Sequence, residues 1–284
     1  MKALVFGDEF SPRQLTDFEV VREPQGDVVA VLTVPERPVD EELISRLPAL
    51  RVIGTASAGY DHVDLEAAAR RGIAVVSVPD YCIAEMADHT LALVYALLRG
   101  VVVLDRLVSA GEWDAKGAGA LGTMDEQRVG IVGLGRVGRA VAARLVALGA
   151  EVWAHDIAPE PGSGVPLVEL GELLAECDVV TMHVPLTPET RGLIGKSQLA
   201  SMRRGALLIN TARGALVDLD AVVEALRNGQ LGGAALDVLP QEPPPAVPAA
   251  PNLILTPHAA YYSRAAEQRV YALAVARVRE LLGA

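Results

Sequence analysis

The chain has 284 residues, of which 51% are hydrophobic and 21% charged, and its formal net charge at pH 7 is −11. This length and composition allow two globular domains with large cores. The acidic balance argues against a nucleic-acid surface, so no nucleic-acid partner is expected. The apolar runs are too short for a signal peptide or a membrane span, so no membrane partner is expected either.

The sequence contains two cysteines, Cys82 and Cys177. Their spacing fits neither a metal site nor the disulfide framework of a secreted protein. We therefore expect free thiols, no metal site, and a reducing compartment, the cytoplasm.

The first part of the chain alternates β-rich runs with helical patterns. The β-rich runs cover 2–6, 27–34, 50–57 and 73–78, and the helical patterns cover 39–47 and 62–72. Strands that alternate with helices predict a parallel sheet covered on both faces. The segment 7–17 leaves little room for a full helix between the first two strands.

A long apolar stretch, residues 89–105, follows this first series and is interrupted at Arg99 and Gly100. We interpret it as a buried helix that joins two domains, because it is too interrupted to span a membrane. A second series of β-rich runs covers 128–133, 151–156, 178–184, 205–211, 233–238 and 252–256, with helical patterns at 136–149 and 218–229. Two series of strands predict two α/β domains.

The second series opens with the glycine motif Gly133-x-Gly135-x-x-Gly138. A β-rich run precedes it and a helical pattern follows at once, as a dinucleotide-binding loop requires. The first glycine permits the tight turn, the second lets the backbone approach a pyrophosphate, and the third lets the helix pack against the strand. The N–H groups at the start of the helix would bind the phosphates.

Asp156 ends the next predicted strand, 18 residues after Gly138. Its carboxylate can accept hydrogen bonds from both ribose hydroxyls, and its charge would repel a 2′-phosphate. The motif therefore predicts NAD as the cofactor rather than NADP.

Three later strands end close to polar residues. Arg213 and His258 each follow a predicted strand, and Glu242 lies in the loop after a third. Ligands of open α/β sheets bind outside the carboxyl ends of the strands. Oxidation of a 2-hydroxy acid needs a base for the hydroxyl proton, a guanidinium for the carboxylate, and a carboxylate that orients the base. These three residues therefore predict that chemistry.

The other histidines are weaker candidates for the base, because the sequence shows no carboxylate partner for any of them. They are His62, His89, His155 and His183. His62 ends the loop 55–62, where it could touch a substrate, but we interpret it as a surface residue at the start of a helix. His89 is interpreted as a buried or interface residue.

The motifs of the chain resemble those of the D-isomer-specific 2-hydroxyacid dehydrogenase family. They are "GIVGLGRVG", "HVPLTPETRGLI", "LINTARGALVD", "GAALDVLPQEPP" and "LTPHAA", in the family's order and spacing, and the resemblance covers nearly the whole chain. The most similar branch contains the C-terminal-binding-protein corepressors and their bacterial enzyme relatives. The resemblance implies two doubly wound parallel-sheet α/β domains. A Rossmann dinucleotide-binding domain, 89–259, would be inserted into a flavodoxin-like substrate domain formed by 1–88 and 260–284.

The resemblance also implies roles for individual residues. It implies that Arg213, Glu242 and His258 are catalytic. The implied cofactor-binding residues are Thr90, Gly133, Gly135, Arg136, Val137, Gly138, Asp156, His183, Val184, Pro185, Thr211, Ala212, Arg213, Asp237 and His258. The implied substrate-binding residues are Ser57, Ala58, Gly59, Arg213 and His258.

These features predict an NAD-dependent oxidoreductase that acts on a small D-2-hydroxy acid or 2-oxo acid. The loop 55–62 has neither lysine nor arginine, which favours a substrate with an uncharged side chain. We expect a homodimer, because 87–98 is strongly apolar and Trp113 lies in the stretch that the family uses for dimer contact. The alternative is an NAD(H)-sensing binding protein, similar to the corepressors, whose catalysis is vestigial.

Overall fold

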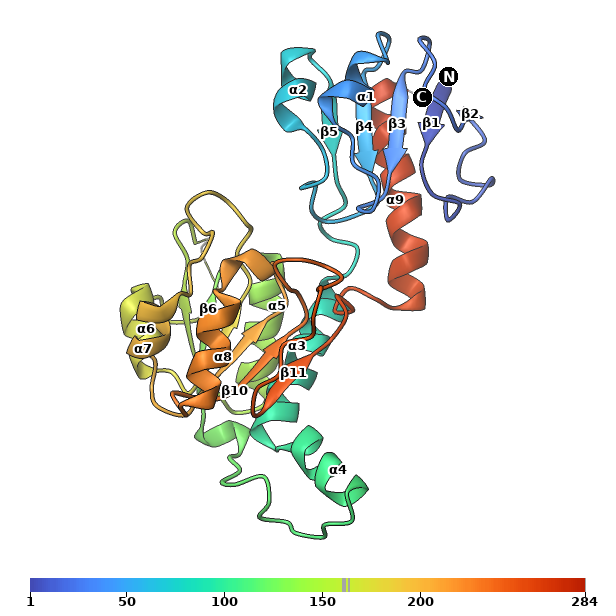
Figure 1. Cartoon of the computed structure of the whole chain (residues 1–284). Helices are drawn as coiled ribbons and strands as arrows, with labels where there is room; N and C mark the ends of the chain where they lie inside the picture. Colours follow the sequence, from blue (N-terminus) through green and yellow to red (C-terminus); the bar gives the residue numbers. More distant parts are fainter. Residues whose placement is uncertain (160–161, 163, 284) are drawn as a thin grey trace. The chain divides into compact units, whose positions relative to one another are not determined.

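The protein is represented by a computed structural model that describes residues 1–159, 162 and 164–283. Contacts divide the chain into two units, Met1–Cys82 with the segment from Tyr262 onward, and Ile83–Tyr261. This division lies a few residues from the domain limits predicted at 88/89 and 259/260. In Figure 1 the blue strands of the N-terminal part and the red C-terminal helix α9 lie in the same unit, so both ends of the chain form it.

The first unit contains one parallel sheet. Its strand order is β2-β1-β3-β4-β5, where β1 is Lys2–Val5, β2 Glu19–Val21, β3 Ala30–Thr33, β4 Val52–Thr55 and β5 Ala74–Val76. This is the order of flavodoxin-like sheets. The described segment between β1 and β2 contains turns and no helix, as predicted. The short edge strand β2 was not predicted.

Helices cover both faces of this sheet. The short helices α1 (Glu41–Ser45) and α2 (Leu65–Arg70) share a buried core with strand residues such as Ile53. The next residue, Gly54, points to the other face, because side chains alternate along a strand. A Cβ atom on Gly54 would overlap Val278 of α9 (Arg264–Leu282), so only glycine lets this helix lie so close to β4.

The second unit contains the larger parallel sheet. Its order is β11-β10-β9-β8-β6-β7, where β6 is Arg128–Val132, β7 Glu151–His155, β8 Val179–Met182, β9 Ala206–Asn210, β10 Leu231–Leu236 and β11 Leu253–Leu255. A single parallel bridge between Ala154 and Leu167 adds the remnant of one more strand beyond β7. With this remnant counted, the strand order is that of a Rossmann sheet.

The strands of the larger sheet are buried on both faces, as parallel strands in α/β proteins are. One face is covered by α6 (Leu170–Glu176), α7 (Lys196–Ser201) and α8 (Leu219–Arg227). The other is covered by α3 (Ile83–Leu98) and α5 (Arg136–Ala147). Within β8, Val180 contributes to the first core and Val179 to the second. The predicted pair of doubly wound parallel sheets is confirmed.

The prediction of one buried helix over 89–105 was wrong. Helix α3 ends at Leu98, and Gly100 adopts a left-handed conformation with φ 58°. A separate helix follows, α4 (Val101–Ser109), and none of its residues is buried. In Figure 1, α4 and the loop after it lie away from the sheet of their unit. No helix in the described part of the chain has the length and apolarity needed to cross a membrane.

Candidate active site

The three predicted catalytic residues lie at one edge of the larger sheet. Arg213 follows β9, Glu242 lies in the loop after β10, and His258 follows β11. These strands are neighbours and run parallel, so their carboxyl ends meet at the same edge. Ligands of open α/β sheets bind at this edge.

His258 and Glu242 form a close pair. The Nδ1 atom of His258 lies 2.7 Å from Oε2 of Glu242. The other oxygen of Glu242 accepts a hydrogen bond from the backbone N–H of Leu239, also at 2.7 Å. A carboxylate at Nδ1 holds the ring proton there, which leaves Nε2 to take or give a proton. Both side chains are partly exposed, at 46% and 35%, so a ligand can reach them.

The turn that carries His258 is held by a buried carboxylate. His258 has a left-handed backbone with φ 52°, and its N–H donates to the carbonyl oxygen of Asp237 at 2.8 Å. The Asp237 side chain accepts from the N–H groups of Ala259 and Ala260 at 2.8 and 2.9 Å. It also accepts from the Thr256 hydroxyl at 2.5 Å. Asp237 thus fixes the backbone on both sides of the histidine. A contact between Asp237 and the cofactor remains a prediction.

His89 extends this network. Its Nε2 atom lies 3.2 Å from the hydroxyl oxygen of Thr256. Because the Thr256 hydroxyl donates its proton to Asp237, its oxygen accepts a hydrogen bond from the Nε2–H group of His89. His89 is therefore a partly buried member of the network within its own unit.

Arg213 is positioned by a buried amide. The side chain of Asn210 donates to the Arg213 carbonyl oxygen at 2.8 Å and accepts from the Ala212 N–H at 3.0 Å. A Cβ atom on Gly214 would overlap the backbone of Leu239, so the turn after β9 touches the loop after β10. Since the N–H of Leu239 also donates to Glu242, this contact links the turn that carries Arg213 to the loop that carries Glu242.

A cavity of about 240 Å³ opens beside the His258–Glu242 pair. Its lining residues are Asp237, Leu239, Glu242, Pro243, Pro244, Thr256, Pro257 and His258. Most of its wall is apolar, and its polar residues are Asp237, Glu242, Thr256 and His258. Such a combination suits a small organic acid.

The glycine motif adopts the predicted geometry between β6 and α5. Gly133 has φ 97°, and a Cβ atom there would lie 2.7 Å from the His183 carbonyl. A Cβ atom on Gly138 would overlap the carbonyl oxygen of Gly133. Gly135 is exposed, and a Cβ atom there would have no neighbour within 4 Å. The loop thus requires glycine for its own packing at two positions and offers an open surface for a ligand at the third.

Asp156 lies directly after β7 and is bound to the glycine loop. One carboxylate oxygen accepts from the Leu134 N–H at 2.6 Å, and the other accepts from the Ala158 N–H at 2.8 Å. Each carboxylate oxygen can accept more than one hydrogen bond, so the ribose hydroxyls can still bind. The residues around α5 therefore fit a dinucleotide.

The remaining predicted cofactor residues of this unit lie at the same edge. Thr90 of α3 is buried, with its hydroxyl oxygen 3.1 Å from that of Thr211. His183 follows β8, and its Nε2 lies 3.0 Å from the Thr181 hydroxyl. Burial of its imidazole lowers the pKa of His183 to about 4, so its ring is neutral at pH 7. Val184 and Pro185 follow it, Ala212 lies beside Arg213, and Arg136 and Val137 begin α5.

The predicted substrate residues of the first unit, Ser57, Ala58 and Gly59, follow the carboxyl end of β4. Ser57 is buried, whereas Ala58 is exposed. Tyr81 of the same unit is 7% exposed and belongs to the core.

Asn210, Thr256 and Gly214 were not singled out from the sequence. All three stand within four residues of the strand ends that carry the site. A polar residue at the last position of a buried strand or directly after it is the signal that could have marked the first two. The need for glycine at 214 depends on a contact with Leu239, which lies 25 residues away, and has no local signal.

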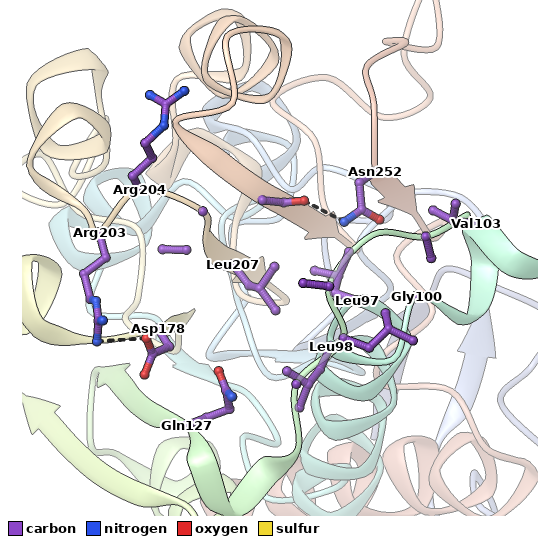
Figure 2. Close-up of a pocket in the computed structure, with 17 residues that line it drawn as sticks. Leu97, Leu98, Gly100, Val103, Gln127, Asp178, Arg203, Arg204, Leu207 and Asn252 are labelled. Atoms are coloured by element: carbon purple, nitrogen blue, oxygen red, sulfur yellow. Dashed lines mark hydrogen bonds and ion pairs between the residues drawn. The ribbon is translucent and has the colours of Figure 1, made fainter. Parts of the chain in front are cut away.

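A second cavity, of about 260 Å³, lies at the amino ends of the larger sheet (Figure 2). Its polar wall includes Asp178, which binds Arg203 at 2.9 Å, and its apolar wall includes Leu97 and Leu207. Arg203 is thus paired. This cavity lies at the opposite ends of the strands from His258. Among the described residues, no group of three or more histidine, cysteine or acidic side chains could hold a metal ion.

Comparisons with known proteins identify the family of this chain. The family model "D-isomer specific 2-hydroxyacid dehydrogenase, NAD binding domain" matches residues 91–260. A glycerate dehydrogenase of Methylorubrum extorquens is 39% identical over 89% of this chain and 82% of its own. A D-3-phosphoglycerate dehydrogenase of Archaeoglobus fulgidus is 40% identical over 89% of this chain, but only 49% of its own length is covered. The crystal structure of a D-lactate dehydrogenase from Aquifex aeolicus, complexed with NAD and lactic acid, has a TM-score of 0.89 and 28% identity, and the match covers 99% of this chain and 96% of that one.

The glycine motif yields a matched pair of substitutions. Gly138→Ala should lower the free energy of unfolding by about 1–3 kcal/mol, because its methyl group forces α5 away from the loop. Gly135→Ala should leave the melting temperature unchanged and weaken NADH binding, because its methyl group occupies open surface. Thermal melting and NADH fluorescence titration measure the two effects. Full NADH affinity in Gly135→Ala would show that the loop is not the binding surface.

Asp156 is expected to determine the preference for NAD. Asp156→Asn should reduce the ratio of kcat/KM with NADH to that with NADPH by about 10- to 100-fold, because the charge that repels a 2′-phosphate is lost. Asp156→Glu keeps the charge and serves as the matched control. Steady-state kinetics with both cofactors checks this. Equal efficiency with NADH and NADPH in the unmodified protein would contradict it.

Proposed function

Because the chain belongs to the D-isomer specific 2-hydroxyacid dehydrogenase family, we propose that Arg213, Glu242 and His258 carry out the interconversion of a small D-2-hydroxy acid and its 2-oxo acid. The protein is an NAD-dependent oxidoreductase of such acids. The assignment of the three residues is supported chiefly by the His258–Glu242 pair, whose atoms lie 2.7 Å apart at the same sheet edge as Arg213.

Each residue has one task in this proposal. Nε2 of His258 removes the proton of the substrate hydroxyl during oxidation and returns it to the carbonyl oxygen during reduction. Glu242 keeps the proton on Nδ1 and stabilises the imidazolium that forms. The Arg213 guanidinium binds the substrate carboxylate through paired N–H donors and polarises the carbonyl.

The cofactor is held at the other end of the same edge. The open surface at Gly135 and the first N–H groups of α5 would receive the pyrophosphate, and Asp156 would bind the ribose. When bound, NAD supplies the hydride acceptor for oxidation, and NADH the hydride for reduction. Neutral His183 would bind the cofactor by hydrogen bonding and not by charge.

The substrate is proposed to carry an uncharged side chain. The loop 55–62 contains no lysine or arginine that could bind a phosphate or a second carboxylate. The relatives include one named for glycerate and one named for 3-phosphoglycerate, and this loop favours the unphosphorylated acid. Glyoxylate, pyruvate and hydroxypyruvate are therefore the first 2-oxo acids to test.

A homodimer is proposed, with α4 and the loop through Trp113 as its interface. The apolar face of α3 packs within its own unit, so that helix offers less free surface than its sequence suggested. In contrast, Val101, Val108 and Trp113 are 54%, 50% and 91% exposed. Large apolar side chains gathered on a projecting segment are typical of a protein interface.

We also propose that the protein works in the cytoplasm. Cys82 and Cys177 are both buried and form no disulfide, which supports a reducing compartment. Burial raises the pKa of the Cys177 thiol to about 12, which makes it unreactive. Fractionation of cells of the source organism checks the location, and recovery of the protein from the medium would contradict it.

Substitutions should separate the catalytic roles. His258→Ala should lower kcat for 2-oxo acids by about 10²–10⁴-fold and leave NADH binding nearly unchanged. Arg213→Ala should raise KM and lower kcat together, because the guanidinium acts on both the bound substrate and the reacting carbonyl. Glu242→Gln should lower kcat, because the imidazolium loses its counter-charge. Absorbance of NADH during turnover measures all three.

Glu224→Gln is the matched control for the last variant, because Glu224 is an exposed residue of α8 paired with Lys196. It should leave kcat unchanged. If the unmodified protein bound NADH but reduced no 2-oxo acid, and His258→Ala changed nothing, the NAD(H)-sensing alternative would replace this proposal.

The dimer is tested by light scattering. At micromolar concentration the mass should be twice the 29.9 kDa of one chain. Trp113→Glu should shift the protein toward the monomer, because it places a charge in an apolar interface. Val247→Glu, at an exposed position outside this segment, is the matched control. A monomeric unmodified protein would refute the dimer.

A further inference from the structure

A chain of side-chain hydrogen bonds lies beneath the loop 56–61 of the first unit. The hydroxyl oxygen of Thr55, the last residue of β4, lies 2.5 Å from that of Ser57. The Ser57 hydroxyl in turn donates to the carbonyl oxygen of Gly59 at 2.5 Å. At the other end, Nε2 of His62 lies 3.1 Å from the Thr55 hydroxyl. Four groups of the same segment are thereby connected in series.

The order of the donors follows from the number of protons. A carbonyl oxygen can only accept, so the single proton of Ser57 is directed to Gly59. Ser57 therefore accepts from Thr55, and Thr55 accepts from His62. Nε2 of His62 must then carry a proton. Burial lowers the pKa of His62, although the negative charges of Asp61 and Glu36 act to raise it. The lowered pKa favours a neutral ring, and the hydrogen bond to Thr55 places its one proton on Nε2.

This series of hydrogen bonds determines which backbone groups the loop exposes. Thr55 and Ser57 are buried, whereas Ala58 and Tyr60 are exposed. With the Gly59 carbonyl turned inward to Ser57, the N–H of Tyr60 points to the opposite side of the same planar trans peptide. Within the described residues, no acceptor binds the backbone N–H of Ala58, Gly59 or Tyr60. Successive free N–H groups of this kind bind anions.

The series of hydrogen bonds also changes the interpretation of Ser57. Its only proton is donated to Gly59, so its hydroxyl is not available to donate to a substrate carboxylate. Ser57 then contributes to binding through the shape of the loop.

We propose that His62 is a positioning residue for substrate binding. Through Thr55 and Ser57 it orients the Gly59 peptide, and so shapes the loop that receives the substrate carboxylate. This inference rests on the proposed function, since it assumes that a 2-oxo acid is the ligand. His62 was interpreted from the sequence as a surface residue, but it is half-buried and bonded to a buried threonine.

The first test is a set of substitutions along the chain. His62→Leu, Thr55→Val and Ser57→Ala should each raise KM for a 2-oxo acid about tenfold, the order expected for the loss of one hydrogen bond. The value of kcat and the affinity for NADH should stay within about twofold. His62→Gln restores a donor near the position of Nε2 and should recover most of the KM. The double variant of His62→Leu and Ser57→Ala should be no worse than either single variant, because both break one series.

Thr33→Val is the matched control. Thr33 pairs with Thr55 in the neighbouring strand, is equally buried, and donates to the carbonyl oxygen of Arg37 outside the chain of bonds. It should lower stability as much as Thr55→Val without changing KM. If KM rose as much in Thr33→Val as in Thr55→Val, general destabilisation would explain both changes, and the inference would be overturned. An unchanged KM in His62→Leu would overturn it as well.

The second test does not depend on turnover. In ¹⁵N-histidine-labelled protein at neutral pH, the nitrogen signals of His62 should show a proton on Nε2 and none on Nδ1. A ring protonated on Nδ1 alone would break the order of donors and overturn the inference. Absence of turnover on every 2-oxo acid would instead refute the proposed function, and with it the identity of the ligand. The nitrogen signals would still decide whether the series of hydrogen bonds exists. Turnover by the unmodified protein with unchanged KM in the variants refutes this inference alone.

Discussion

The arrangement of the active site depends on the hydrogen bonds that the buried carboxylate of Asp237 accepts. A charge removed from water is costly unless donors surround it, and here two backbone N–H groups and a hydroxyl do so. The donors belong to residues 256, 259 and 260, which enclose His258 on both sides. The carboxylate therefore holds a left-handed histidine in place while the imidazole itself stays accessible. The stabilising hydrogen bonds are thus made by the buried Asp237, and the reacting imidazole of His258 remains exposed.

Glycine allows close backbone contacts along the same edge. Gly214 brings the turn of Arg213 against Leu239, and Leu239 binds the far oxygen of Glu242. Gly133 and Gly138 bring the dinucleotide loop against β8 and α5 in the same way. At each of these positions a methyl group would overlap backbone, and backbone has nowhere to move in a packed sheet. The geometry of the site is thus maintained by close backbone contacts as much as by side chains.

Both units use the carboxyl ends of parallel strands for their polar groups. In the larger sheet these ends carry the His258–Glu242 pair, and in the smaller sheet the end of β4 carries the hydrogen-bonded loop from Thr55 to His62. In each case a buried polar residue at the last strand position, Asn210 or Thr55, orients the loop that follows. A strand end is suited to this, because its side chains are fixed by the sheet while the next backbone groups are still without ladder partners.

The sequence by itself determined the two parallel sheets, the dinucleotide loop with Asp156, and the three polar residues at neighbouring strand ends. These features depend on periodicity and on glycine spacing, which act over a few residues and can be recognised locally. Only the tertiary structure decided the break at Gly100, the tasks of Asp237 and Gly214, and the burial of His62 beside Thr55. Gly100 interrupts an apolar run whose pattern does not show which part will be buried. Asp237 and Gly214 act on residues 19 to 25 positions away, and such contacts exist only once the strands have been aligned side by side.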